Sequence, residues 1–152
     1  MTRYLAAAVA VFLLAACGSS GGGETDKPTG AAADVSHALC TKDAAAKKVT
    51  PPAGFPSDFP MPPGTIVYAA DDRGQDGIVV TGVTATPFRT TLKSLQTALP
   101  AAGFKPDEGE VEPHDAESDW SSSGYRGRWA IREIPQCSGE TLVNVVARKN
   151  AG

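Results

Sequence analysis

The chain has 152 residues, with 14 lysines and arginines against 17 aspartates and glutamates, and its formal net charge is −3. This length accommodates one domain, and the lack of a basic surplus argues against a nucleic-acid-binding protein. Charged residues make up 20% of the chain and aromatic residues 7%. This composition excludes a highly charged disordered tail and an aromatic-rich barrel.

Residues 1–16 have the layout of an export signal. Arg3 is followed by an uncharged apolar run from Tyr4 to Cys17. At 14 residues the run is shorter than the ~20 residues that a membrane-spanning helix needs. A positive start, a short apolar core and small residues are typical of a signal peptide. The alternatives are an ordinary secretory peptide or a single buried thiol at Cys17.

The apolar run ends in a motif that resembles the lipobox of bacterial lipoproteins, which has the form Leu-Ala-[Ala/Gly]-Cys. Its residues here are Leu14, Ala15, Ala16 and Cys17. The resemblance implies cleavage before Cys17 and a thioether-linked diacylglycerol on its sulfur. Because two acyl chains hold a protein stably on a membrane, the implied location is the extracytoplasmic face of the cell membrane. The abundance of alanine and glycine is similar to that of actinobacterial proteins.

Residues 17–34 are expected to form a flexible tether. After Cys17 this segment has no aromatic and no branched aliphatic side chain. It therefore cannot bury enough apolar surface to offset the entropy of ordering. A flexible chain of this length has a mean end-to-end distance of roughly 20–25 Å, which would hold the folded part close to the membrane surface.

Cys40 and Cys137 are left once Cys17 is acylated. In an exported protein, two remaining cysteines are most simply explained by one disulfide bond. It would close a loop of about 97 residues and contribute up to ~4–5 kcal/mol in the chain-entropy model. A reactive thiol or a metal site is the alternative. The chain has no Cys-x-x-Cys motif, and His37 is the one histidine at ligand spacing from a cysteine.

Residues 35–64 are predicted to form a proline-rich arm. Six prolines lie in residues 51–63, with Phe55, Phe59 and Met61 between them. Proline fixes φ and restricts the residue before it, so the arm should be extended and stiff. We expect its aromatic side chains to pack along the domain edge, and binding of a proline-recognising partner is the functional alternative.

Residues 65–150 carry the pattern of an α+β domain. Strands are predicted at 65–70 and 78–85, which are rich in β-branched residues, with a polar turn between them. Thr86 would cap a helix that has Pro87 at its first position, and Pro100 and Gly103 would mark its end. The apolar stripe of this helix is Phe88, Leu92, Leu95 and Leu99.

The segment from Asp107 to Asp119 contains seven carboxylates and no lysine or arginine. A turn at residues 121–124 would place this segment against a following basic strand. Opposite charges across a hairpin contribute roughly 0.2–1 kcal/mol per pair, so ion pairing alone explains the acidic residues. The facing pairs in this register are Trp120–Tyr125, Asp119–Arg126 and Glu117–Arg128.

With a last strand at residues 141–147, the predicted element order is ββαβββ. This order gives an α+β fold, with an antiparallel four- to five-stranded sheet and one amphipathic helix packed on one face. The residues Pro62-Pro63-Gly64-Thr65 and Ala102-Gly103-Phe104 are similar to those that open the first strand and end the helix in small bacterial lipoproteins and secreted domains of unassigned function. That resemblance implies a fold and not an activity.

The acidic hairpin is the candidate ligand site, with Asp115, Glu117, Asp119 and Trp120 as its residues. Alternate residues of a strand share one face, so three carboxylates could face a cation. An EF-hand loop needs glycine at its sixth position and glutamate at its twelfth, and this chain has Trp120 and Arg126 there. Ion pairing with the basic strand is the competing and favoured explanation.

Trp120, Tyr125 and Trp129 are predicted to share the opposite face of the hairpin. If exposed, they would form an aromatic platform for a glycan or a protein partner. If the helix covers them, they belong to the core, which is the favoured interpretation.

Catalytic chemistry is not indicated. His114, Asp115 and residues 121–123 could be imagined as a Ser/His/Asp set, but the chain has no G-x-S-x-G elbow and no phosphate-binding glycine motif. We expect no enzyme activity, no cofactor and no metal. The predicted function is a membrane-anchored, non-catalytic binding module that contacts an envelope protein or cell-wall glycan. A carrier or sensor of a small ligand or cation, acting through the acidic hairpin, is the alternative.

Overall fold

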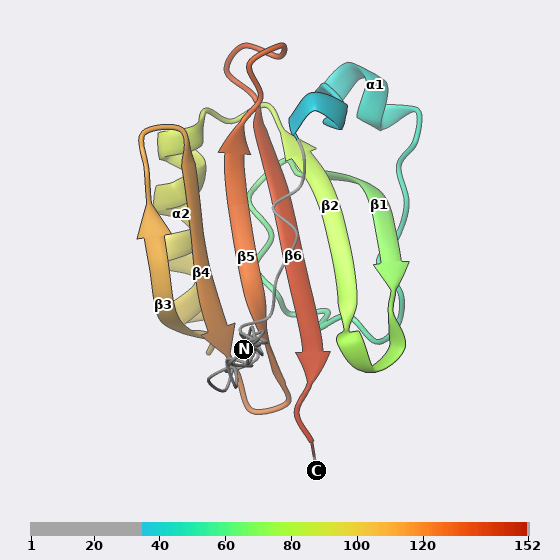
Figure 1. The fold of residues 1–152 in the computed structure, drawn as a ribbon, viewed down its shortest axis with the longest axis vertical. Coiled ribbons are helices and arrows are strands. Elements are labelled where there is room, and N and C mark those ends of the chain that lie inside the picture. Colours follow the sequence, from blue (N-terminus) through green and yellow to red (C-terminus); the bar gives the residue numbers. More distant parts are fainter. Residues whose placement is uncertain (1–34, 152) are drawn as a thin grey trace, which may run out of the picture.

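The structure is a computed structural model that describes residues 35–151. The predicted signal peptide, the lipidation site at Cys17 and the tether lie outside the described residues. The described part of the chain forms a six-stranded antiparallel sheet with one main helix, α2, on one face (Figure 1). Within residues 35–151, no helix is long and apolar enough to cross a membrane.

The strands lie in the order β1-β2-β6-β5-β4-β3, so the last strand of the chain pairs with β2 in the middle of the sheet. They are β1 (Ile66–Asp72), β2 (Ile78–Thr84), β3 (Lys105–Val111), β4 (Asp115–Ser121), β5 (Tyr125–Glu133) and β6 (Thr141–Lys149). The helices are α1 (Thr41–Ala45) and α2 (Phe88–Ala101), with 3-10 turns η1 (Val35–His37) and η2 (Gly74–Asp76).

The predicted α+β class and single main helix are confirmed, but the predicted sheet of four to five strands was too small. The order is ββαββββ, because the acidic segment folds as two strands, β3 and β4, that reverse at Pro113. Every residue of β3 is exposed at the sheet edge. A strand that buries neither face has no apolar alternation, and its sequence therefore carried no strand signal.

The helix α2 buries the predicted apolar stripe of Phe88, Leu92, Leu95 and Leu99. Pro87 is its N-cap and not its first helical residue, and it has no side-chain cap. The helix also runs through Pro100 before it ends. Gly103 then adopts a φ of 82°, which glycine tolerates without strain.

The main core lies between the sheet and a layer formed by α2 and the proline-rich arm. Phe55 and Phe59 of the arm are buried in this core, as predicted for the aromatic residues of the arm. Phe59 packs against Phe104 and Trp120, with ring centroids 5.3 and 5.2 Å away. The arm is not simply extended, since η1 and α1 lie in its first half.

The opposite side of the sheet is covered at one end by α1, over the ends of β1 and β2 (Figure 1). This small second cluster is built on Ala44, Val83, Leu142, Ile134 and Cys137. The rest of that side, which we name the open face, has no helix from residues 35–151 over it. Residues directly opposite one another on antiparallel strands share a face. By this rule the open face carries Asp115, Glu117, Asp119 and Ser121 of β4, Arg126, Arg128, Ala130 and Arg132 of β5, Asn144, Val146 and Arg148 of β6, and Val79 and Thr81 of β2.

Candidate functional site

The β4–β5 hairpin pairs in a register in which each β4 residue faces a β5 residue two positions beyond the predicted one. Asp119 lies opposite Arg128 and Trp120 opposite Gly127, where the prediction placed Arg126 and Tyr125. A Cβ atom on Gly127 would lie 2.7 Å from the Trp120 ring. Any residue larger than glycine at position 127 would therefore block the place that the indole occupies in this register. Because alternate residues of a strand share one face, an offset of two residues leaves every side chain on its predicted face.

Arg128 organises the predicted acidic site. Its guanidinium donates from Nη1 to Glu117 Oε1 at 2.6 Å and from Nε to Asp119 Oδ1 at 2.7 Å. A third bond runs from Nη2 to Asp119 Oδ2 at 3.3 Å. The ion pairing predicted between Glu117 and Arg128 is therefore confirmed. Arg126, the other predicted partner, lies opposite Ser121 instead.

The Arg128 side chain is 9% exposed, while the two carboxylates are about one-quarter exposed. The hydrogen bond to Asp119 is the main cause that raises the pKa of Arg128. Burial opposes it, and the charges of Asp119 and Glu117 add to it. A buried charge with hydrogen-bond partners on both sides is a specific, directional arrangement. One guanidinium thus serves two carboxylates, and each carboxylate has an arginine partner within the chain.

Asp115, the third predicted acidic residue, forms an ion pair with Arg132 across the same two strands. Next to it, the imidazole Nδ1 of His114 bonds to the Glu133 carboxylate. These side chains line a hollow of about 580 Å³ at the end of the sheet, together with Val35 and the β5–β6 loop. Both carboxylates at this end are therefore held by a neighbouring side chain.

The Ser/His/Asp set considered from the sequence is not assembled. His114 precedes β4, whereas residues 121–123 begin at the last residue of that strand. A strand of seven residues at ~3.3 Å per residue separates them by roughly 20 Å. The histidine and the serines therefore cannot share a proton.

Trp120, the fourth predicted binding residue, is not on the open face. Trp120 and Trp129 are 2% and 3% exposed on the α2 side of the sheet, and Tyr125 packs against the same cluster. The core interpretation of these aromatic residues is confirmed. Both buried indole N–H groups lack a hydrogen-bond acceptor among the described residues, and we have no physical account of that feature.

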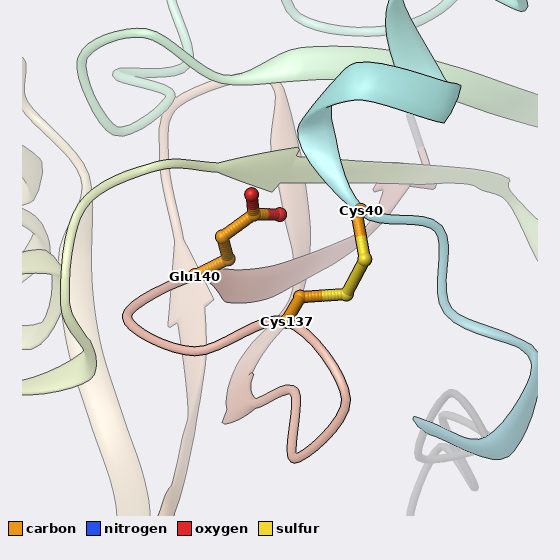
Figure 2. Close-up of side chains that lie close together, drawn as sticks. All are labelled: Cys40, Cys137 and Glu140. Atoms are coloured by element: carbon orange, nitrogen blue, oxygen red, sulfur yellow. A yellow bond between two sulfur atoms is a disulfide. The ribbon is translucent and has the colours of Figure 1, made fainter.

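The predicted disulfide between Cys40 and Cys137 is confirmed, with the two Cα atoms 5.6 Å apart. Glu140 lies beside it and completes the one group of three metal-ligand side chains within residues 35–151 (Figure 2). A disulfide offers no thiolate to a metal. The two Glu140 oxygens accept hydrogen bonds from the Thr41 backbone N–H and hydroxyl, both at 2.7 Å.

This cluster is therefore a structural junction. Cys40 is the N-cap of α1, but its side chain makes no capping hydrogen bond. Glu140 reaches across from the β5–β6 loop and supplies the missing acceptor at the start of the helix. No local pattern indicates this role, because Glu140 and Thr41 are 99 positions apart in the sequence.

The open face also brings together polar residues that the sequence analysis did not place opposite one another. Thr81 donates from its hydroxyl to Asn144 Oδ1 at 3.0 Å, across β2 and β6. Arg126 and Arg148 lie directly opposite one another on β5 and β6. No local pattern marks these contacts, because each joins residues that are far apart in the sequence. The open face is thus a largely polar surface on which several side chains are held by hydrogen bonds across neighbouring strands.

Comparisons of the chain with models of protein families, with curated proteins and with solved structures found no match.

Proposed function

We propose that this protein is a lipid-anchored, non-catalytic binding module on the extracytoplasmic face of the cell membrane. The lipobox-like sequence ending at Cys17 supports the anchor, and the Cys40–Cys137 disulfide fits an oxidising compartment. The observation that carries the binding role is the open face. It presents charged and amide side chains on a sheet, and no helix of the described part of the chain lies over them.

The partner that fits this surface is an envelope protein or a cell-wall glycan. Charged groups in fixed positions give an interface its specificity and register. Arg128, Thr81 and Asn144 are held by side-chain hydrogen bonds on three adjacent strands. Little side-chain entropy would then be lost when a partner binds, which favours affinity.

The cation-carrier alternative has less support. Asp115, Glu117 and Asp119 each already bond to an arginine of β5. A cation would have to displace those guanidinium groups, and Arg128 would then be left with its buried charge unpaired. Such a loss is unfavourable by several kcal/mol.

The test is photo-cross-linking in membranes of cells that make the full chain. A photoreactive residue is placed at Val79 or Val146, which lie opposite one another on the open face, and at the exposed Gln96 of α2 as a control. We expect a discrete cross-linked adduct from the two open-face positions and none from Gln96. Adducts that are equal from all three positions, or none from the open face, would overturn the binding role.

The same cells make a Cys17→Ser variant, which tests the anchor separately. We expect the wild-type protein in the membrane fraction with the added mass of acyl chains, and the variant unprocessed or released. If both proteins are unacylated and absent from the membrane fraction, the anchor is wrong. The cross-linking result then still decides the binding role.

A further inference from the structure

Four arginines project from β5 and β6 onto the open face, and they fall into two classes. Arg128 and Arg132 are ion-paired with carboxylates of β4. Arg126 and Arg148 have no ion pair within residues 35–151, although they lie directly opposite one another across the two strands. Like charges directly opposite in a sheet are destabilising.

The two unneutralised arginines are held differently. Arg126 is exposed. Arg148 donates from Nε to the backbone carbonyl of Asp76 at 2.7 Å, and its side chain lies against Gly77, where a Cβ atom would overlap it. A carbonyl is a neutral acceptor, so this bond orients the guanidinium without cancelling its charge. The two Nη groups of Arg148 are left for another acceptor.

The same row continues toward the sheet edge. Arg126 lies opposite Ser121, and Ser121 lies opposite Lys105. Because neighbouring strands are ~4.8 Å apart, three cations and one hydroxyl stand in a row across four adjacent strands. We name these residues, Lys105, Ser121, Arg126 and Arg148, the basic row.

Two acidic side chains of the open face, Asp119 and Asp71, are bonded to arginines outside the basic row. Both oxygens of Asp119 accept from Arg128, and Asp71 of β1 is bonded to Arg73 at 2.8 Å. Within residues 35–151 none of its three cations has an ion pair, so the row keeps a formal charge of +3.

We propose that the basic row binds the phosphate group of an anionic ligand. The planar guanidinium fork matches two phosphate oxygens, and a dianion between Arg126 and Arg148 would remove their mutual repulsion. Ser121 adds a hydroxyl donor beside Arg126, and Lys105 adds a mobile ammonium group. The inference stands on the strand register alone and does not depend on the lipid anchor. The phosphate chemistry is shared by soluble phosphate compounds and by lipid headgroups.

The test uses the full chain at low ionic strength in phosphate-free buffer, with inorganic pyrophosphate as the probe in titration calorimetry. We expect binding that weakens by about tenfold or more in Arg126→Gln and that falls as salt is added. Lys93→Gln removes one exposed cation of α2 and should leave the affinity unchanged. An equal loss of pyrophosphate affinity in Arg126→Gln and Lys93→Gln would overturn the proposal. It would also be overturned if the wild-type protein gave no heat with pyrophosphate and did not bind the anionic vesicles described below.

A second arm separates the two sources of phosphate. Co-sedimentation is measured with vesicles of anionic phospholipid and of zwitterionic phospholipid, for the wild-type chain and for Arg126→Gln, which share the same N-terminus. Binding to anionic vesicles that is lost in Arg126→Gln identifies a lipid headgroup. Pyrophosphate binding without such a difference identifies a soluble phosphate compound.

Misfolding of the variant is excluded by urea unfolding in phosphate-free buffer. Arg126→Gln removes a like-charge contact, so it should unfold at the same or a higher urea concentration than the wild-type protein.

Discussion

At the scale of single residues, Arg128 shows how this domain keeps charge in its sheet. The side chain is almost fully buried, yet three of its nitrogen atoms donate to Glu117 or Asp119. A buried charge is tolerated when its hydrogen-bonding groups are paired. The acidic residues of β4 are thus explained by the structure of the domain, and a role in metal binding is not needed to account for them.

The first prediction follows from this contact. Replacing Arg128 by alanine leaves Glu117 and Asp119 close together without a counter-charge. The free energy of unfolding should then fall by about 2 kcal/mol or more, as measured by urea unfolding at neutral pH. Arg126→Ala is the matched control on the same strand and face, and it should change the free energy by no more than about 0.5 kcal/mol. Equal effects of the two variants would contradict the assigned role of Arg128.

At the scale of elements, the strand register depends on a close approach at Gly127. A Cβ atom there would overlap the Val146 carbonyl oxygen of β6 and lie 2.7 Å from the Trp120 ring of β4. One glycine therefore allows three adjacent strands to pack closely. The predicted register left this residue without a role, since it placed Tyr125 opposite Trp120.

We accordingly predict that Gly127→Ala lowers the free energy of unfolding by about 3 kcal/mol, because a backbone carbonyl cannot move aside without breaking the sheet. Gly124→Ala in the adjoining loop meets no atom within 4 Å and should be neutral within about 0.5 kcal/mol. Chemical denaturation of the two variants and of the wild-type protein measures these changes in the free energy of unfolding. A stable Gly127→Ala protein would show that the strands can separate locally at low cost.

The edge strand β3 illustrates a different constraint. Its residues are exposed on both faces, and it carries Asp107, Glu108 and Glu110 next to Pro106. Charges and proline on an edge strand disfavour pairing with a second sheet. The acidic composition of this segment is therefore explained by its position at the edge, as that of β4 is explained by its arginine partners.

At the scale of the whole molecule, the disulfide joins the start of the described chain to the β5–β6 loop. Cys40 precedes α1 and Cys137 follows β5, and Glu140 caps α1 from the same loop. The part of the arm that follows α1 then crosses to the other side of the sheet and buries Phe55 and Phe59 in the main core. The disulfide thus fixes one end of a segment that is needed to close the core.

Removal of this link should affect the whole domain. The double variant Cys40→Ala/Cys137→Ala should lose about 2–4 kcal/mol of unfolding free energy, measured by urea unfolding. Reduction of the wild-type protein with a dithiol should give a comparable loss, while the same reductant should not change the variant. A reduced wild-type protein that is as stable as the oxidised one would show that α1 and the arm are held by packing alone.

Much of the fold was predictable from local patterns. The stripe of four apolar residues in α2 and the β-branched runs of β2 and β6 each indicate burial on one face or both. The pairing of Cys40 with Cys137 followed from a count of the remaining cysteines. These features could be inferred because each depends on residues that are near in sequence or on a choice with one simple outcome.

The tertiary structure decided the number of strands, the hairpin register and the composition of each face. Strand β3 has no alternation because it buries neither side, and the register depends on the fit of Trp120 against Gly127. The basic row and the cap by Glu140 join residues on separate strands and loops. The sequence by itself therefore determined the α+β class, the main helix and the disulfide. Contacts between distant segments determined which side chains meet, because side-chain pairing across a sheet is set by register and not by local propensity.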